Sequence, residues 1–384
     1  MDISYILNHL GEDRKNYFNA IAPPIIQSSN FAFDSIIDFR EKIAQEFETN
    51  VYTRGNNPTV EILRKKLAAL EHAEDCLVFS SGVAAVAASI MGNVAAGDHI
   101  VCVKSVYSWT KTLLQKYLSR FGVTHTYVDG KDLDAIAAAI TPQTKLLFLE
   151  SPTTMTFELQ DLAACAQLAK KHGLITVIDN SYCSPYFQNP IDYGIDLVLH
   201  SGTKYINGHS DVVMGVLCGS NEMIKKIFFS EYMTIGHILH PQDAFLAIRG
   251  LRTLPLRVQR SHDSCATLVE RLSTHPKIEK IYYPFISTQQ ALAVKQMRGG
   301  GLFSMQVKAK TKEDMMLFCE SLKYFLMAVS WGGHESLIMP TITFYDMPGM
   351  PDPELPWNFV RIYIGLEEVD ILYNDLVQAL ERLK

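Results

Sequence analysis

Short, mainly apolar runs alternate with helical patterns over the first half of the chain. Runs of this length are typical of strands that are buried on both faces of a parallel sheet. Between them, apolar residues recur at helical spacing, as in residues 161–172, which end at Gly173. The alternation predicts an α/β fold with a mostly parallel sheet and helices on both faces. The expected strands are residues 76–79, 99–103, 145–149, 174–178 and 195–199.

The two ends of the chain have a different pattern. Residues 1–50 show no sustained period, which favours an arm that lies over another surface. A basic helical pattern over residues 257–273 leads into strand-like segments at 278–283 and 359–365. The chain is also too long for one comfortable hydrophobic core. We therefore expect an N-terminal arm (1–50), a large domain (51–248) and a smaller C-terminal α/β domain (249–384).

Composition narrows the functional classes. The chain has 384 residues, of which 48% are hydrophobic and 20% charged, as in a folded globular protein. A net charge of −6 gives no support for nucleic-acid binding. We expect no membrane span, because no apolar run is long enough, and no signal peptide, because residues 1–4 lack its basic-then-apolar layout. The seven cysteines are scattered without a C-x-x-C pair, which predicts reduced thiols in a cytoplasmic protein and no zinc site.

The segment after the run 195–199 carries candidate chemistry. Open α/β sheets place ligands at the carboxyl ends of their strands, and this segment begins there. The hydroxyl groups of Ser201 and Thr203 can bind phosphate oxygens, and Gly202 allows a close backbone approach. Lys204 could hold a carbonyl cofactor as a Schiff base if its amine is partly desolvated. The alternative is a solvated surface lysine.

Two further segments point to the same edge of the sheet. Asp179 ends the expected strand 174–178, so it should lie beside Lys204, although a turn or helix-cap role is common for such an aspartate. Residues 80–83 (Ser-Ser-Gly-Val) join a strand to an Ala-rich helix, and a helix N-terminus favours anions. Their spacing matches neither the dinucleotide nor the P-loop motif. A plain strand-to-helix connection is the alternative.

Two arginines are candidate anion receptors. Arg361 lies inside an apolar strand-like segment, and a buried arginine generally needs an anionic partner. We therefore predict that it receives a carboxylate. Arg54, beside Tyr52 in the turn before Pro58, could clamp a phosphate, or it could be an exposed turn residue.

Together these segments resemble the pyridoxal-phosphate enzymes of cysteine and methionine metabolism, the trans-sulfuration enzymes. The lysine motif, residues 201–211, matches the family most clearly. The resemblance covers nearly the whole chain and implies the type I aminotransferase-like fold. The other matching segments are Tyr52-x-Arg54, Asn57-Pro58-Thr59, Ser81-Gly82, Tyr107, Asp179-Asn180, residues 249–254, Ser330-x-Gly332-Gly333 and Arg361.

The resemblance implies a role for each matching residue. Lys204 would hold pyridoxal 5′-phosphate as a Schiff base and move protons, Asp179 would pair with the pyridine nitrogen, and Tyr107 would stack on the ring. Arg361 and Ser330 would receive the substrate's α-carboxylate. The residues that would hold the phosphate are Ser81, Gly82, Val83, Ser201 and Thr203, with Tyr52 and Arg54 from a neighbouring subunit.

A site shared between subunits implies at least a dimer, and this family is typically a homotetramer built as a dimer of dimers. Residues 1–50 would then contact a neighbouring subunit. The expected ligand is a small amino-acid thioether; we expect no metal, nucleic acid or membrane partner.

Departures from the family pattern favour the cystathionine β-lyase branch. Val329-Ser330-Trp331-Gly332-Gly333 stands where synthases and γ-lyases usually have Glu-Ser-Leu-Gly-Gly, and its tryptophan resembles the bacterial β-lyase loop. Thr154 replaces the asparagine of the usual Ser-Pro-Thr-Asn-Pro motif. Tyr232 matches a β-lyase position near the substrate, and Trp109 replaces the cysteine typical of methionine γ-lyase.

Other residues, such as Asn57-Pro58-Thr59, are closer to the synthase and γ-lyase side. Cystathionine γ-synthase is therefore the first alternative, and cystathionine or methionine γ-lyase the next. A cofactor-binding protein without turnover is disfavoured, because Lys204, Asp179 and Arg361 are intact.

Overall fold

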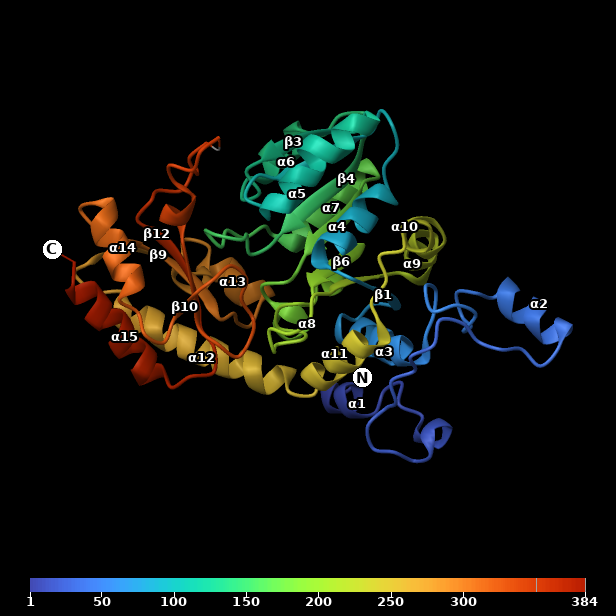
Figure 1. Ribbon diagram of the computed structural model, residues 1–384. Helices are drawn as coiled ribbons and strands as arrows, with labels where there is room; N and C mark the ends of the chain where they lie inside the picture. Colours follow the sequence, from blue (N-terminus) through green and yellow to red (C-terminus); the bar gives the residue numbers. More distant parts are fainter. Residues whose placement is uncertain (350, 384) are drawn as a thin grey trace.

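The computed structural model describes residues 1–349 and 351–383 and contains two sheets (Figure 1). The larger sheet has seven strands in the order β1-β7-β6-β5-β4-β2-β3. Only β7 runs antiparallel to its neighbours, so the predicted mostly parallel sheet is confirmed. Its strands are β1 (Asp75–Phe79), β2 (His99–Val103), β3 (Thr124–Val128), β4 (Thr144–Glu150), β5 (Ile175–Asp179), β6 (Leu197–Ser201) and β7 (Gly215–Gly219).

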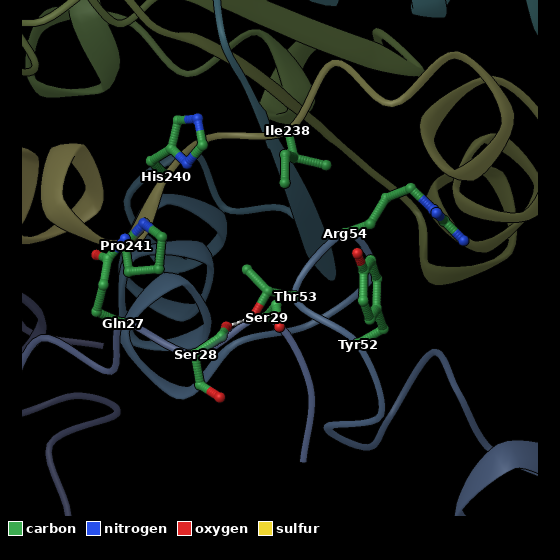
Figure 2. Close-up of a pocket in the computed structure, with 9 residues that line it drawn as sticks. All are labelled: Gln27, Ser28, Ser29, Tyr52, Thr53, Arg54, Ile238, His240 and Pro241. Atoms are coloured by element: carbon green, nitrogen blue, oxygen red, sulfur yellow. Dashed lines mark hydrogen bonds between the residues drawn. The ribbon is translucent and has the colours of Figure 1, made fainter.

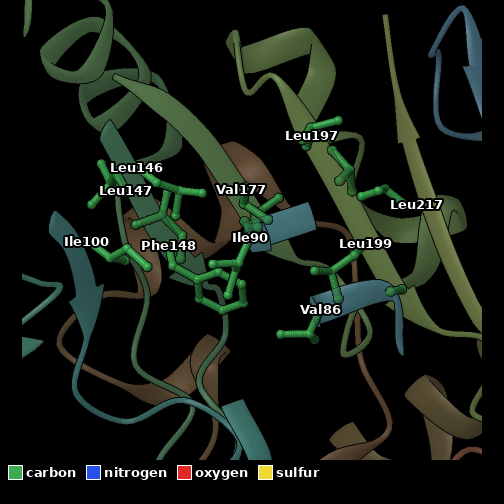
Figure 3. Close-up of a cluster of buried hydrophobic side chains, with 14 of the residues drawn as sticks. Val86, Ile90, Ile100, Leu146, Leu147, Phe148, Val177, Leu197, Leu199 and Leu217 are labelled. Carbon is green, nitrogen blue, oxygen red and sulfur yellow. The ribbon is translucent and has the colours of Figure 1, made fainter. Parts of the chain in front are cut away.

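Strand side chains alternate between two cores on opposite faces of this sheet. In β1, Leu77 and Phe79 join the core that includes Val86 of α4 (Gly82–Met91), whereas Cys76 and Val78 join the core that includes Leu63 of α3 (Pro58–Leu70). Figure 3 shows the first core, where Val86 lies beside Leu199, and Ile90 lies near Val177 and Phe148. Because both faces are covered by helices, the strands read as apolar runs in the sequence.

The second sheet has the order β10-β11-β12-β9-β8 and is mainly antiparallel. Val360 and Ile362 of β12 face a separate core with α12, α14 and α15. Arg361 lies between them and therefore projects from the opposite face of the sheet. The elements are β8 (Ile278–Tyr282), β9 (Leu302–Val307), β10 (Leu326–Met327), β11 (Leu337–Pro340), β12 (Phe359–Tyr363), α12 (Leu254–Leu272), α13 (Gln290–Gln296), α14 (Lys312–Glu320) and α15 (Val369–Glu381).

The remaining helices connect the strands or flank the large sheet. The helix expected from residue 107 is shorter, because the π-helical turn Leu113–Tyr117 follows α5. Helix α12 starts earlier than expected, with Pro255 in its first turn, where no helical N–H is lost. These helices are α5 (Ser108–Thr112), α6 (Leu133–Ala138), α7 (Leu162–His172), α8 (Ser184–Phe187), α9 (Asn221–Ile227), α10 (Met233–Ile235) and α11 (Pro241–Leu251).

The N-terminal segment has two parts that behave differently. Ile6 and Leu7 of α1 (Ile3–Asn8) are buried, and α1 packs on α3. The buried Glu12 side chain pairs with Lys66 at 3.0 Å and with Arg252 at 2.9 Å, which ties this segment to the body. By contrast, α2 (Ile36–Ala44) buries no residue and projects away from the body in Figure 1. Across the described residues, no helix is long and apolar enough to cross a membrane.

Candidate active site

The carboxyl ends of three adjacent parallel strands define the candidate site. Glu150 ends β4, Asp179 ends β5, and Lys204 follows β6. Glu150 and Asp179 are direct partners in the parallel ladder, so their side chains project from the same face. Asp179 in turn pairs with Leu199, which places it beside the strand that leads to Lys204. The sheet therefore brings Asp179 and Lys204 to one edge, as the sequence predicted.

The Lys204 amine lies in a partly closed environment. Its Nζ donates a hydrogen bond to Ser330 Oγ at 2.5 Å and lies 5.7 Å from the centre of the Trp331 ring. Burial, together with the positive charge of Arg361, lowers the pKa of Lys204 to about 8. Gly332, with φ of +91°, allows this contact, because a Cβ there would stand 2.8 Å from Lys204 Cα. A lysine with this pKa can give and take protons near neutral pH.

Arg361 is a buried guanidinium whose hydrogen-bond partners are all neutral. It donates to Thr154 O at 3.4 Å and to Ser330 O at 3.3 Å. Two thioether sulfurs, of Met155 at 3.9 Å and Met339 at 3.5 Å, complete its contacts. Burial lowers the pKa of Arg361 to about 10. Long, neutral contacts leave such a cation suited to an incoming carboxylate.

A buried carboxyl group (Glu150), a partly buried one (Asp179) and one aromatic ring complete the inner part of the site. Asp179 Oδ1 accepts from the Ser181 N–H at 2.9 Å, and burial raises the pKa of Asp179. Glu150 Oε2 accepts from the Tyr107 N–H at 2.8 Å, and burial together with Asp179 raises the pKa of Glu150 well above its ordinary value. The Tyr107 side chain is partly exposed at this edge.

Sequence reasoning missed Glu150. The signal was present, because Glu150 follows the apolar run 145–149 just as Asp179 follows 174–178.

The N-terminus of α4 lies against the end of β6. A Cβ on Gly82 would stand 2.9 Å from Ser201 Cβ, so only glycine permits this approach. Ser81 Oγ accepts from the Ala84 N–H at 3.1 Å, and first-turn N–H groups such as those of Gly82 and Val83 have no helical acceptor. The Thr203 hydroxyl donates to Met214 O at 3.3 Å and accepts from Met214 N at 2.9 Å, so it already fixes the turn.

The structure places Tyr232, which the sequence predicted near the substrate, in the core of the large sheet. Tyr232 is buried in the core, where its hydroxyl donates to Val78 O at 3.1 Å. Its ring packs edge-to-face on Phe79 at 5.3 Å and also contacts Phe228. Because its side chain satisfies both packing and hydrogen bonding there, it is a structural residue.

Tyr52 and Arg54 line a separate pocket, shown in Figure 2. The Arg54 guanidinium lies 5.2 Å from the centre of the Tyr52 ring. The other lining residues are residues 27–29, Thr53, Ile238, His240 and Pro241, the first residue of α11. Lys204, Asp179 and Arg361 do not line it. Participation of Tyr52 and Arg54 in a neighbouring subunit's site therefore stays a prediction.

Comparison with known proteins decides the family. The profile described as "Cys/Met metabolism PLP-dependent enzyme" matches residues 5–381. The chain belongs to this family. An L-methionine gamma-lyase of Treponema denticola is 38% identical, over 96% of this chain and 94% of that protein. A cystathionine gamma-lyase from Lactobacillus plantarum, solved with L-serine, aligns with a TM-score of 0.91 and 34% identity, covering 100% of this chain and 99% of the other.

The crystal structure of metB from Corynebacterium glutamicum aligns with a TM-score of 0.92 and 35% identity, over 99% and 98% of the two chains. The predicted family, the type I fold and the pyridoxal-phosphate-dependent carbon–sulfur lyase class are therefore confirmed. The β-lyase branch is not confirmed by these relatives.

The geometry of this chain fits pyridoxal phosphate. Gly82 brings the unpaired first-turn N–H groups of α4 close to Ser201, and a helix N-terminus of this kind favours a phosphate. A lysine amine with a pKa of about 8 lies beside it in sequence and space, since Lys204 follows Ser201 by three residues. In the described residues, no group of three His, Cys, Asp or Glu side chains could hold a metal ion.

Proposed function

We propose that the protein cleaves the Cβ–S bond of an amino-acid thioether such as L-cystathionine, releasing a thiol and aminoacrylate, which takes up one water to give pyruvate and ammonia. The supporting observation is the position of the Trp331 ring beside Lys204. The Trp331 ring lies 5.7 Å from Lys204 Nζ and packs on Tyr205 at 5.3 Å, in place of the family's usual leucine. We infer that this ring limits the room for a reaction at the more distant Cγ.

The residue before Ser330 supports the same proposal. Val329 stands where synthases and γ-lyases usually carry glutamate, and its side chain is 68% exposed. A valine cannot accept a hydrogen bond from a substrate amine. It also cannot act as a second base next to Ser330. A γ-elimination needs a further proton removed at Cβ, whereas a β-elimination needs only the Cα proton.

Each polar residue of the site has a proposed task. Arg361 and the Ser330 loop would orient the substrate by its α-carboxylate, which exposes the Cα proton to Lys204 Nζ. Lys204 would remove that proton and later protonate the leaving sulfur. Asp179 would hold a proton on the cofactor's ring nitrogen, and Tyr107 would cover the ring face. When bound, pyridoxal phosphate supplies an electron sink for negative charge at Cα.

Gly82, Val83, Ser81, Ser201 and Thr203 would hold the cofactor's phosphate, with Tyr52 and Arg54 reaching in from a second copy. The proposed assembly is thus at least a dimer, and a homotetramer by resemblance. We also propose residues 1–50, 51–248 and 249–384 as arm, large domain and small domain.

A second candidate is γ-elimination, because the Treponema denticola relative is named L-methionine gamma-lyase. One assay separates the two. Purified holoprotein is incubated with L-cystathionine and with L-methionine, and the 2-oxo acid and thiol are identified. Pyruvate with homocysteine supports the proposal. Oxobutyrate from either substrate replaces it with γ-elimination. A further incubation, with an activated homoserine plus cysteine, tests γ-replacement, and cystathionine formation there replaces the proposal with that reaction.

A further inference from the structure

Glu150 is the one fully enclosed acid of the site without a task in the reaction above. It ends β4, and its side chain is buried. Its Oε2 accepts from the backbone N–H of Tyr107 at 2.8 Å. It therefore fixes the backbone of Tyr107, just before α5, and the Tyr107 side chain is the one proposed to cover the cofactor ring.

The charged and titratable groups that face Glu150 come from four elements. Cys102 is on the adjacent strand β2, Tyr107 precedes α5, Asp179 ends β5, and Arg361 is on β12. Asp179, its direct ladder partner, disfavours a second negative charge, whereas Arg361 favours one. No hydrogen bond joins Glu150 and Arg361 among the described residues, so the two interact through space.

We propose that Glu150 is the positioning residue that balances the charge of Arg361: it anchors Tyr107 and takes up a proton from solvent when a substrate carboxylate binds the guanidinium. The inference rests on the proposed role of Arg361 as carboxylate receptor. A bound carboxylate neutralises Arg361, which is the group that favours the ionised form of Glu150. Glu150 then faces Asp179 and the new anion without a free cation, so it binds a proton.

The sign of the pH dependence follows from this linkage. Burial and Asp179 already raise the pKa of Glu150, and carboxylate binding raises it further. At pH values where Glu150 is already protonated in the free enzyme, carboxylate binding needs no proton from solution and does not depend on pH through Glu150. Binding weakens as the pH rises through the free-state pKa, because the proton must then be taken up from solution.

Propionate is the probe, because it has a carboxylate but no amine and no leaving group. Its dissociation constant for the holoenzyme is measured by calorimetry at a series of pH values. For the unaltered protein, the constant should rise by up to about tenfold for each pH unit between the free-state and the carboxylate-bound pKa of Glu150, and level off above the second. Glu150→Gln keeps an acceptor for the Tyr107 N–H but does not titrate, so its propionate affinity should lose this slope.

Three further variants make the test decisive. Glu150→Asp keeps a titrating carboxyl group and should restore the slope, which a purely structural role would not require. Glu279→Gln, at an exposed position on β8, should leave the slope unchanged. Arg361→Gln should abolish propionate binding.

Equal slopes in the unaltered protein and Glu150→Gln would overturn the inference about Glu150 and leave the role of Arg361 intact. Unchanged propionate binding in Arg361→Gln would overturn both.

Discussion

The Arg257 guanidinium fills the space where a side chain at Gly208 would begin: a Cβ on Gly208 would stand 1.7 Å from Arg257 Nη1. Arg257 donates to Tyr205 O at 2.9 Å and to Gly250 O at 2.8 Å. One buried cation thus fixes the turn that follows Lys204 against the start of α12. The Lys204 loop owes its position to this contact as well as to the sheet.

Gly208→Ala tests that contact. Gly208 has φ of +69°, so alanine adds backbone strain as well as the overlap with Arg257. We expect the free energy of unfolding to fall by about 2–4 kcal/mol, measured by chemical denaturation. Gly173→Ala is the matched control, with φ of +67° and nothing within 4 Å of its Cβ. Gly173→Ala should lower the free energy of unfolding by about 1 kcal/mol. Equal decreases for Gly208→Ala and Gly173→Ala would contradict the role of Arg257.

Lys204→Met should stabilise the apoprotein at neutral pH. The pKa of Lys204 is lowered to about 8 in the folded state, from an ordinary 10.5 in the unfolded chain. Below pH 8 the folded state carries the full cost of a desolvated ammonium, on the order of 3 kcal/mol. Between the two pKa values only the unfolded chain holds the proton, so the stability of the unaltered protein rises with pH.

The stabilisation by Lys204→Met should therefore shrink as the pH rises from about 8 towards 10.5. Denaturation of both apoproteins across this range checks the slope. Lys295→Met, at a solvent-exposed position beside Asp161, should show no such trend. A difference that is constant with pH would mean that Lys204 is neutral or well solvated.

Arg361→Gln should weaken substrate binding far more than it alters folding. Loss of a buried charge-assisted carboxylate contact costs about 2–5 kcal/mol, so KM for the active thioether should rise at least about thirtyfold. Cofactor absorbance should persist, because Arg361 is not assigned to the cofactor. Arg260→Gln, which removes a solvent-exposed pair with Glu368, should leave KM unchanged. An unchanged KM in Arg361→Gln would remove the carboxylate assignment.

The double variant Val329→Glu with Trp331→Leu gives the loop the sequence usual in synthases and γ-lyases. It adds an acceptor beside Ser330 and removes the ring next to Lys204. We expect the ratio of oxobutyrate to pyruvate from L-cystathionine to increase about tenfold. The single variants Val329→Glu and Trp331→Leu show how much of the change in product ratio comes from the added carboxylate and how much from the lost ring. An unaltered ratio in the double variant would show that reaction choice does not depend on this loop.

The sequence by itself determined the α/β architecture and the family, and it indicated the residues of the candidate site. Strands buried between two helical layers must be apolar, so each strand could be recognised in the sequence as an apolar run. The polar residues at the ends of these runs stood out from the apolar residues before them. Asp179 and Lys204 were found in this way, because the position of a strand's carboxyl end is a local property. Glu150 shows the same pattern, because it directly follows the apolar run 145–149.

Only the tertiary structure decided which distant residues meet. Arg361 contacts Thr154 and Ser330 because the two sheets pack with the open face of β12 towards the large sheet's loops. Tyr232, predicted beside the substrate, is instead buried against Phe79, since the folded core offered its ring and its hydroxyl better partners. Contacts of this kind depend on packing between segments far apart in the chain, and no local pattern of residues records them.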